Sequence, residues 1–79
     1  MIVATKREAR ALARRLSRST GGGVALAGFA RTGQVASYGD LWAEMREIVW
    51  QAPRDSAAEV GDECRGLRFW IHDNVEMAS

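Results

Sequence analysis

The sequence is short of cysteine, histidine and proline, and it has no long apolar run. Its 79 residues include one cysteine, Cys64, one histidine, His72, and one proline. A single cysteine allows no internal disulfide, and one histidine beside it leaves too few ligands for a zinc site. The longest apolar stretch, residues 24–30, is far shorter than the ~20 residues of a membrane-spanning helix. We therefore expect a fold without metal, cofactor or disulfide, and no membrane span.

Acidic residues are scarce in the N-terminal part of the chain. Residues 1–18 hold six basic residues and one acid, Glu8, whereas residues 19–79 hold five basic residues and nine acids. One element therefore carries most of the positive charge. The N-terminus meets charge at Lys6 and Arg7, which is not the pattern of a secretory signal. We expect a cytoplasmic protein.

The length and composition are those of one small globular domain. Hydrophobic residues make up 47% of the chain and charged residues 27%, which is typical of a folded protein. We expect a single domain over residues 1–79, with a loose tail from about residue 75.

The first predicted element is a helix over residues 6–18. Thr5 and Glu8 have the spacing of a capping box, and alanine, leucine and arginine fill the segment. At 100° per residue, Leu12 and Leu16 fall on one face with Ala9 and Ala13. The opposite face carries a row of four arginines: Arg7, Arg10, Arg14 and Arg18.

The middle of the chain reads as a hairpin and a second helix. Three glycines at 21–23 end the first helix, and residues 24–30 and 34–38 are predicted as strands joined by a turn at 31–33. Asp40 is a candidate N-cap for a helix over 41–51, whose apolar stripe includes Leu41, Met45 and Ile48. Trp50 projects away from that stripe.

The last part reads as a short helix and a strand. Ser56 and Glu59 have capping-box spacing before a short helix to about Cys64. Residues 67–72 alternate between apolar and polar, which is typical of a half-buried strand. In that strand Arg68 and Trp70 would point outward.

These elements predict an α+β fold with a small antiparallel sheet of three or four strands and two main helices on one face. If Ile2 and Val3 add an edge strand, the order becomes β-α-β-β-α-β, a ferredoxin-like arrangement.

Binding is a better explanation of the sequence than catalysis. Cys64 and His72 form the only possible pair of a cysteine nucleophile and a histidine base, and the predicted elements do not bring them together. We therefore expect no enzyme. Two sets of residues are candidates for binding a partner: the arginine row (Arg7, Arg10, Arg14 and Arg18) and the outward pair Arg68 and Trp70.

Two classes of partner fit these residues. The arginines could bind an acidic protein surface, as in an inhibitor or adaptor, or the phosphates of a nucleic acid, as in a small regulator. Nucleic-acid-binding modules are usually strongly basic, whereas this chain has a pI near 8.0 and an acidic region after residue 18. We favour the protein partner.

Residues 33–41 resemble the segment that leads into the DNA-binding helix of alkylguanine-DNA alkyltransferases. That family places its active site in a Pro-Cys-His-Arg context, whereas Cys64 lies between Glu63 and Arg65. A helix-turn-helix also needs a second helix close behind the first, whereas Pro53 and an acidic stretch follow residues 41–51 here. The activity is not carried over.

In size and overall character the chain is similar to the small phage-encoded anti-CRISPR proteins, which are stand-alone domains without catalytic motifs. The resemblance implies a protein of a bacterial host's cytoplasm that binds a CRISPR effector subunit and blocks recognition or cleavage of the target DNA.

Overall fold

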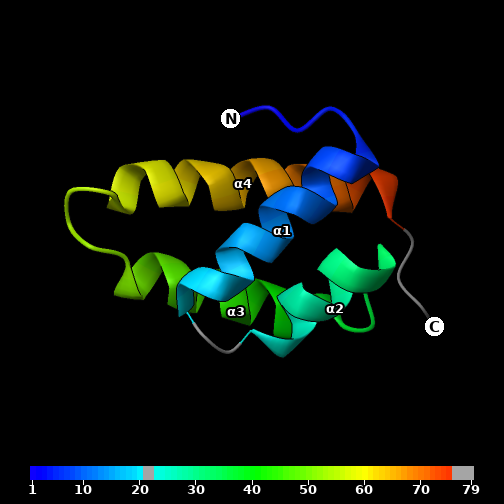
Figure 1. The fold of residues 1–79 in the computed structure, drawn as a ribbon, viewed down its shortest axis with the longest axis horizontal. Helices are drawn as coiled ribbons and strands as arrows, with labels where there is room; N and C mark the ends of the chain where they lie inside the picture. The colour runs from blue at the N-terminus through cyan, green and yellow to red at the C-terminus, as the bar shows by residue number, and fades with distance from the viewer. Residues whose placement is uncertain (21–22, 76–79) are drawn as a thin grey trace.

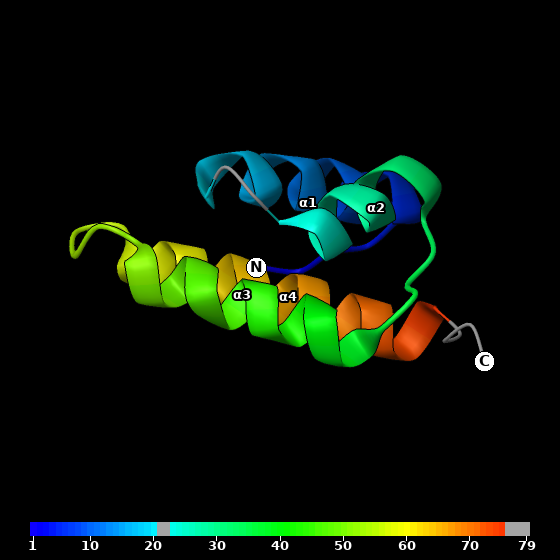
Figure 2. The same ribbon diagram turned by 90° about the horizontal axis from the view of Figure 1, so that it is seen from below.

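The structure is a computed structural model that describes residues 1–20 and 23–75. Four α-helices account for the regular structure of these residues: α1 (Lys6–Thr20), α2 (Val24–Thr32), α3 (Tyr38–Gln51) and α4 (Ala57–Asn74). They form two antiparallel hairpins, α1 with α2 and α3 with α4, stacked as two layers (Figures 1 and 2). The α+β prediction is therefore wrong, because no sheet forms within the described part of the chain.

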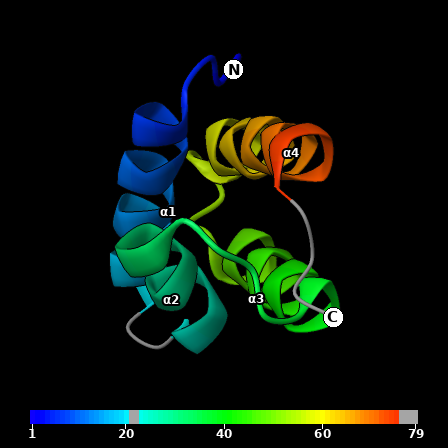
Figure 3. The ribbon, with the colours of Figure 1, turned by 90° about the vertical axis from the view of Figure 1, so that its right-hand side faces the viewer.

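The first helix confirms its prediction. The hydroxyl of Thr5 accepts a hydrogen bond from the backbone N–H of Glu8 at 3.1 Å, as an N-cap does. The apolar stripe faces the second layer and is buried, with Leu12 and Leu16 at its centre. Figure 3, which looks nearly along α3 and α4, shows α1 lying against both helices of that layer.

The predicted hairpin of strands is a helix followed by an extended connection. Alanine-rich residues 24–32 form α2, because Leu26, Phe29 and Ala30 have the i, i+3, i+4 spacing of a buried helical face. The expected turn residue Gly33 ends this helix in the left-handed conformation, with a φ of 74°. Val35, which the sequence placed in the second strand, is buried in the connection to α3.

Neighbouring helices fix both ends of α2, which at nine residues is too short to be stable alone. The Glu44 carboxylate on α3 accepts hydrogen bonds from the backbone N–H groups of Ala25 (2.7 Å) and Leu26 (3.0 Å). At the other end, the Arg10 guanidinium donates to the carbonyls of Ala30 (2.9 Å) and Arg31 (2.7 Å). Each charge has the sign that the helix dipole favours at its end.

The third helix starts earlier than predicted. Ser37, and not Asp40, is the N-cap, and its hydroxyl accepts from the backbone N–H of Asp40 at 3.2 Å. The predicted stripe of Leu41, Met45 and Ile48 is buried as expected.

The fourth helix replaces both the short helix and the strand expected at the C-terminal end. Its buried residues Cys64, Leu67 and Ile71 are spaced at i, i+3 and i+7, and Phe69, which a strand would have buried, is 64% exposed. The second capping box is also wrong, because the Ser56 hydroxyl donates to the Pro53 carbonyl instead.

The N-terminal arm lies along α4 and does not form the edge strand that the ferredoxin-like alternative required. The ammonium group of Met1 pairs with Asp62, and a Cβ at Gly66 would lie 2.5 Å from the Met1 carbonyl oxygen. Val3 packs against the core, and Ile2 is exposed. At the other end of the chain Val75 also packs on the core, and the tail expected after it lies outside the described residues.

Candidate functional site

A groove of about 690 Å³ runs between α3 and α4. Its apolar lining comes from Met45, Val49 and Cys64 and from two tryptophans, Trp42 and Trp50. Gly61 leaves one wall without a side chain, and the space beside it is open. The remaining lining residues are three arginines: Arg46, Arg65 and Arg68.

The charges of this groove are opposite to those of the segment that builds it. Residues 37–79 contain four basic residues and nine acidic ones. Three of the four bases line the groove, and none of the eight acids among the described residues of this segment does. Within the described residues, no carboxylate forms an ion pair with any of these three arginines. The groove is therefore a basic and aromatic site in an otherwise acidic half of the chain.

One wall of the groove is fixed by a series of side-chain contacts. The Tyr38 and Trp42 rings stack with their centroids 5.3 Å apart, and the Arg68 guanidinium carbon lies 5.0 Å from the Trp42 ring centroid. The Tyr38 hydroxyl donates to the Val75 carbonyl, which joins the start of α3 to the end of α4. This wall is therefore formed before any partner binds.

The other end of the groove carries a tryptophan that is not packed in the core. Trp50 lies two turns after Trp42 on α3 and is 84% exposed. An exposed indole is costly in water and is among the side chains most enriched at the energetic centres of protein interfaces.

Arg68 and Trp70, which were expected to share a face, lie on different sides of α4. Residues two apart are separated by about 200° on a helix, whereas they share a face only on a strand. Arg68 points into the groove, and Trp70 is half-buried with its ring centroid 6.5 Å from that of Phe29. Trp70 therefore belongs to the border of the core.

The arginine row of α1 lies in the other layer. Arg7, Arg14 and Arg18 are exposed, as predicted, but Arg10 is half-buried against the end of α2. Arg10, Arg14 and Arg18 border a shallow hollow of about 370 Å³ between α1 and α2, to which Arg31 also contributes. The row and the groove are thus separate surfaces.

The structure does not bring together a nucleophile and a base from Cys64 and His72. Cys64 is buried, with its sulfur 4.0 Å from the Met45 carbonyl, and burial raises the pKa of its thiol. His72 is exposed and lies two turns further along α4 beside Asp73, at 3.4 Å. Among the described residues, no three histidine, cysteine or acidic side chains are grouped to hold a metal ion.

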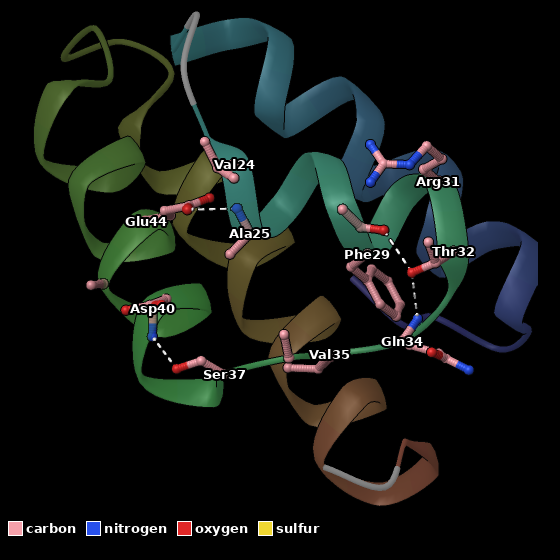
Figure 4. Close-up of a pocket in the computed structure, with 13 residues that line it drawn as sticks. Val24, Ala25, Phe29, Arg31, Thr32, Gln34, Val35, Ser37, Asp40 and Glu44 are labelled. Carbon is pink, nitrogen blue, oxygen red and sulfur yellow. Dashed lines mark hydrogen bonds between the residues drawn. The ribbon is translucent and has the colours of Figure 1, made fainter. Parts of the chain in front are cut away.

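A second hollow, of about 630 Å³, lies between α2 and the start of α3 (Figure 4). Figure 4 shows that its polar groups serve the backbone: Glu44 binds the start of α2 and Ser37 caps α3. Thr32 donates to the Gly28 carbonyl and accepts from the N–H of Gln34. These contacts build the fold and leave little polar chemistry for a ligand.

No protein-family model, curated protein or solved structure matches this chain. None of the described helices is both long and apolar enough to cross a membrane.

The segment that resembles the alkyltransferases takes a different arrangement from a helix-turn-helix. A second helix does follow α3 after a loop, but α4 runs antiparallel beside it, as Figures 1 and 2 show. In a DNA-binding helix-turn-helix the two helices cross at ~90–120°.

Sequence reasoning missed most of the groove. Trp42, Arg46 and Trp50 recur every four residues, a helical spacing that places them on one face. Arg65 and Arg68 were missed as partners of that face because their segment was interpreted as a helix end and a strand.

Proposed function

We propose that this protein is a non-enzymatic binding protein whose α3/α4 groove binds an acidic segment of another protein. The observation that supports it best is the selective lining: two tryptophans and three arginines, with no acid among the described residues, in the acidic half of the chain. Tryptophan and arginine dominate the energetic centres of protein interfaces. Guanidinium groups bind carboxylates through paired hydrogen bonds, so an acidic partner complements the three arginines.

The chemistry of the groove also defines the partner's segment. An apolar side chain would insert over Met45 and Val49, between Trp42 and Trp50, and flanking acids would meet the arginines. The absence of a side chain at Gly61 lets a partner backbone come close to α4. We expect affinity to depend on a few central contacts, with little contribution from the rim.

The resemblance to anti-CRISPR proteins gives a narrower form of the proposal. The partner would then be a subunit of a CRISPR effector complex, and occupation of the groove would block recognition or cleavage of the target DNA. A purified effector assayed for DNA binding and cleavage, with and without the protein, tests this narrower form directly.

The broader proposal is tested by capture from bacterial lysate treated with nuclease. The bait proteins are the wild type, Trp50→Ala combined with Arg46→Ala, and a matched control, Arg54→Ala, which removes an exposed arginine from the loop after α3. We expect a protein that is captured by the wild type and the control and lost with the groove variant. Capture that survives in the groove variant would contradict the proposal.

A further inference from the structure

The two layers of the fold carry opposite charge. Residues 1–36, which include α1 and α2, have seven basic residues and one acid, a net charge of +6. Residues 37–79, which include α3 and α4, have four basic residues and nine acids, a net charge of −5. The weak net charge of the whole chain disfavours a nucleic-acid partner, but the net charge of the α1/α2 layer alone does not. The fold separates the charges, so the α1/α2 layer is a strongly basic surface.

The arginines of this layer converge from two helices. Arg14 and Arg18 of α1 and Arg31 of α2 border the hollow between the two helices, and all three are exposed. Arg7 lies on the same face of α1 as Arg14, two turns earlier. Within the described residues, none of these four arginines forms an ion pair. Like charges at i, i+4, as in Arg14 and Arg18, slightly destabilise a helix, so the fold gains nothing from the row itself.

The lining of this hollow distinguishes it from the α3/α4 groove. Its floor is made of Ala27 and Ala30, and no aromatic or large aliphatic side chain lines it. A protein partner would find no pocket for an apolar anchor there. Phosphate groups need none, because the planar guanidinium fork binds them through paired hydrogen bonds.

We propose that the α1/α2 face binds the phosphate backbone of a nucleic acid. Arg7, Arg14, Arg18 and Arg31 are the phosphate contacts, and Arg10 is held by α2 and helps to position that helix. Contacts to phosphates carry no sequence information, so binding is independent of base sequence. The surface is distinct from the groove, and the protein could therefore hold a nucleic acid and an acidic protein on different sides.

The salt dependence of binding measures the number of phosphate contacts. For a duplex, the logarithm of the binding constant falls by about 0.9 per phosphate for each unit of log salt. Four contacts predict a slope of about −3.6, which is a roughly 150-fold loss of affinity between about 50 and about 200 mM salt. Replacing Arg14 and Arg18 with glutamine should reduce the slope to about −1.8, a roughly 12-fold loss.

The experiment measures fluorescence anisotropy of a labelled duplex of random sequence at several salt concentrations. The proteins are the wild type, the double variant Arg14→Gln/Arg18→Gln, and a control double variant in the α3/α4 groove, Arg46→Gln/Arg68→Gln. The two double variants have the same net charge. The single variant Arg31→Gln, on the other helix, should reduce the slope by about 0.9. Circular dichroism establishes that each variant is folded.

We expect the slope to become less steep in the α1 and α2 variants and to stay at the wild-type value in the groove control. An equal fall in both double variants would overturn the proposal, because it would show an effect of net charge alone. Absence of duplex binding at low salt would also overturn it. So would binding to anionic lipid vesicles or to polyglutamate without any binding to the duplex. None of these results depends on the α3/α4 groove having a protein partner.

Discussion

The Arg15 guanidinium of α1 forms an ion pair with the Glu63 carboxylate of α4, and Glu63 as a whole is only 4% exposed. The pair joins the two layers of the fold. A buried charge is costly unless it is paired, so Glu63 depends on this single arginine among the described residues.

Arg15→Ala should therefore lower the free energy of unfolding by about 2 kcal/mol, because it leaves the Glu63 carboxylate buried without its partner. The neighbouring exposed Arg14 is the matched control, and Arg14→Ala should change stability by less than about 0.5 kcal/mol. Urea denaturation measures both. Equal stability of the two variants would show that the ion pair contributes nothing.

The effect of replacing a glycine with alanine on stability should depend on the space and the backbone conformation at that glycine. Gly28 in α2 and Gly61 in α4 have helical backbones with open space where a Cβ would lie. Replacing either with alanine should raise stability by about 0.5–1 kcal/mol. Gly33→Ala should lower it by about 1–2 kcal/mol, because φ is +74° there and Lys6 occupies the space. Thermal melting of the three variants checks the order, and destabilisation by Gly28→Ala would contradict it.

Trp50 and Trp70, both expected from the sequence to point away from the core, should respond differently to truncation. Trp70 packs on Phe29, so Trp70→Ala should cost about 2 kcal/mol or more of stability. Trp50 is almost fully exposed, and Trp50→Ala should cost less than about 0.5 kcal/mol. Chemical denaturation of each variant decides. A stable Trp70→Ala variant would remove Trp70 from the core border.

Cys64 should be protected in the native protein. The thiolate is the reactive form, and burial both raises the pKa of the thiol and blocks access to it. Because the unfolded chain ionises first, this thiol favours the folded state below a pH of ~8.5 and does so less as the pH rises. Alkylation should be slow at neutral pH and become fast in urea, and non-reducing gels should show no linked dimer. Rapid native alkylation would place the thiol at the surface.

The sequence predicted the helices better than the fold, for a specific physical reason. The helices over 6–18 and 41–51 have long stripes of period 3.6 that no strand can bury. Residues 67–72 are ambiguous, because Leu67 and Ile71 are four apart and fit both periods. Phe69 lies between them at the spacing of a strand and favoured that interpretation, yet it is exposed on α4. Helical glycines at 61 and 66 also concealed the continuity of α4.

The functional surfaces were predicted to the extent that their helices were. The exposed arginines of α1 follow from its periodicity, and three of the four lie where expected. Arg10 could not be assigned, because its partners are carbonyls of a helix that was expected to be a strand. The α3/α4 groove needs the antiparallel pairing of two helices, which neither stripe specifies alone.

The affinity of the captured protein partner for the Trp50→Ala variant tests the central proposal most directly. Trp50 contributes little to the fold, so a change in binding reports on the groove itself. Isothermal titration calorimetry with the purified partner should show affinity reduced by about 2 kcal/mol, or roughly 30-fold, with Arg54→Ala unchanged. Wild-type affinity in Trp50→Ala would contradict the assignment of the α3/α4 groove as the protein-binding site.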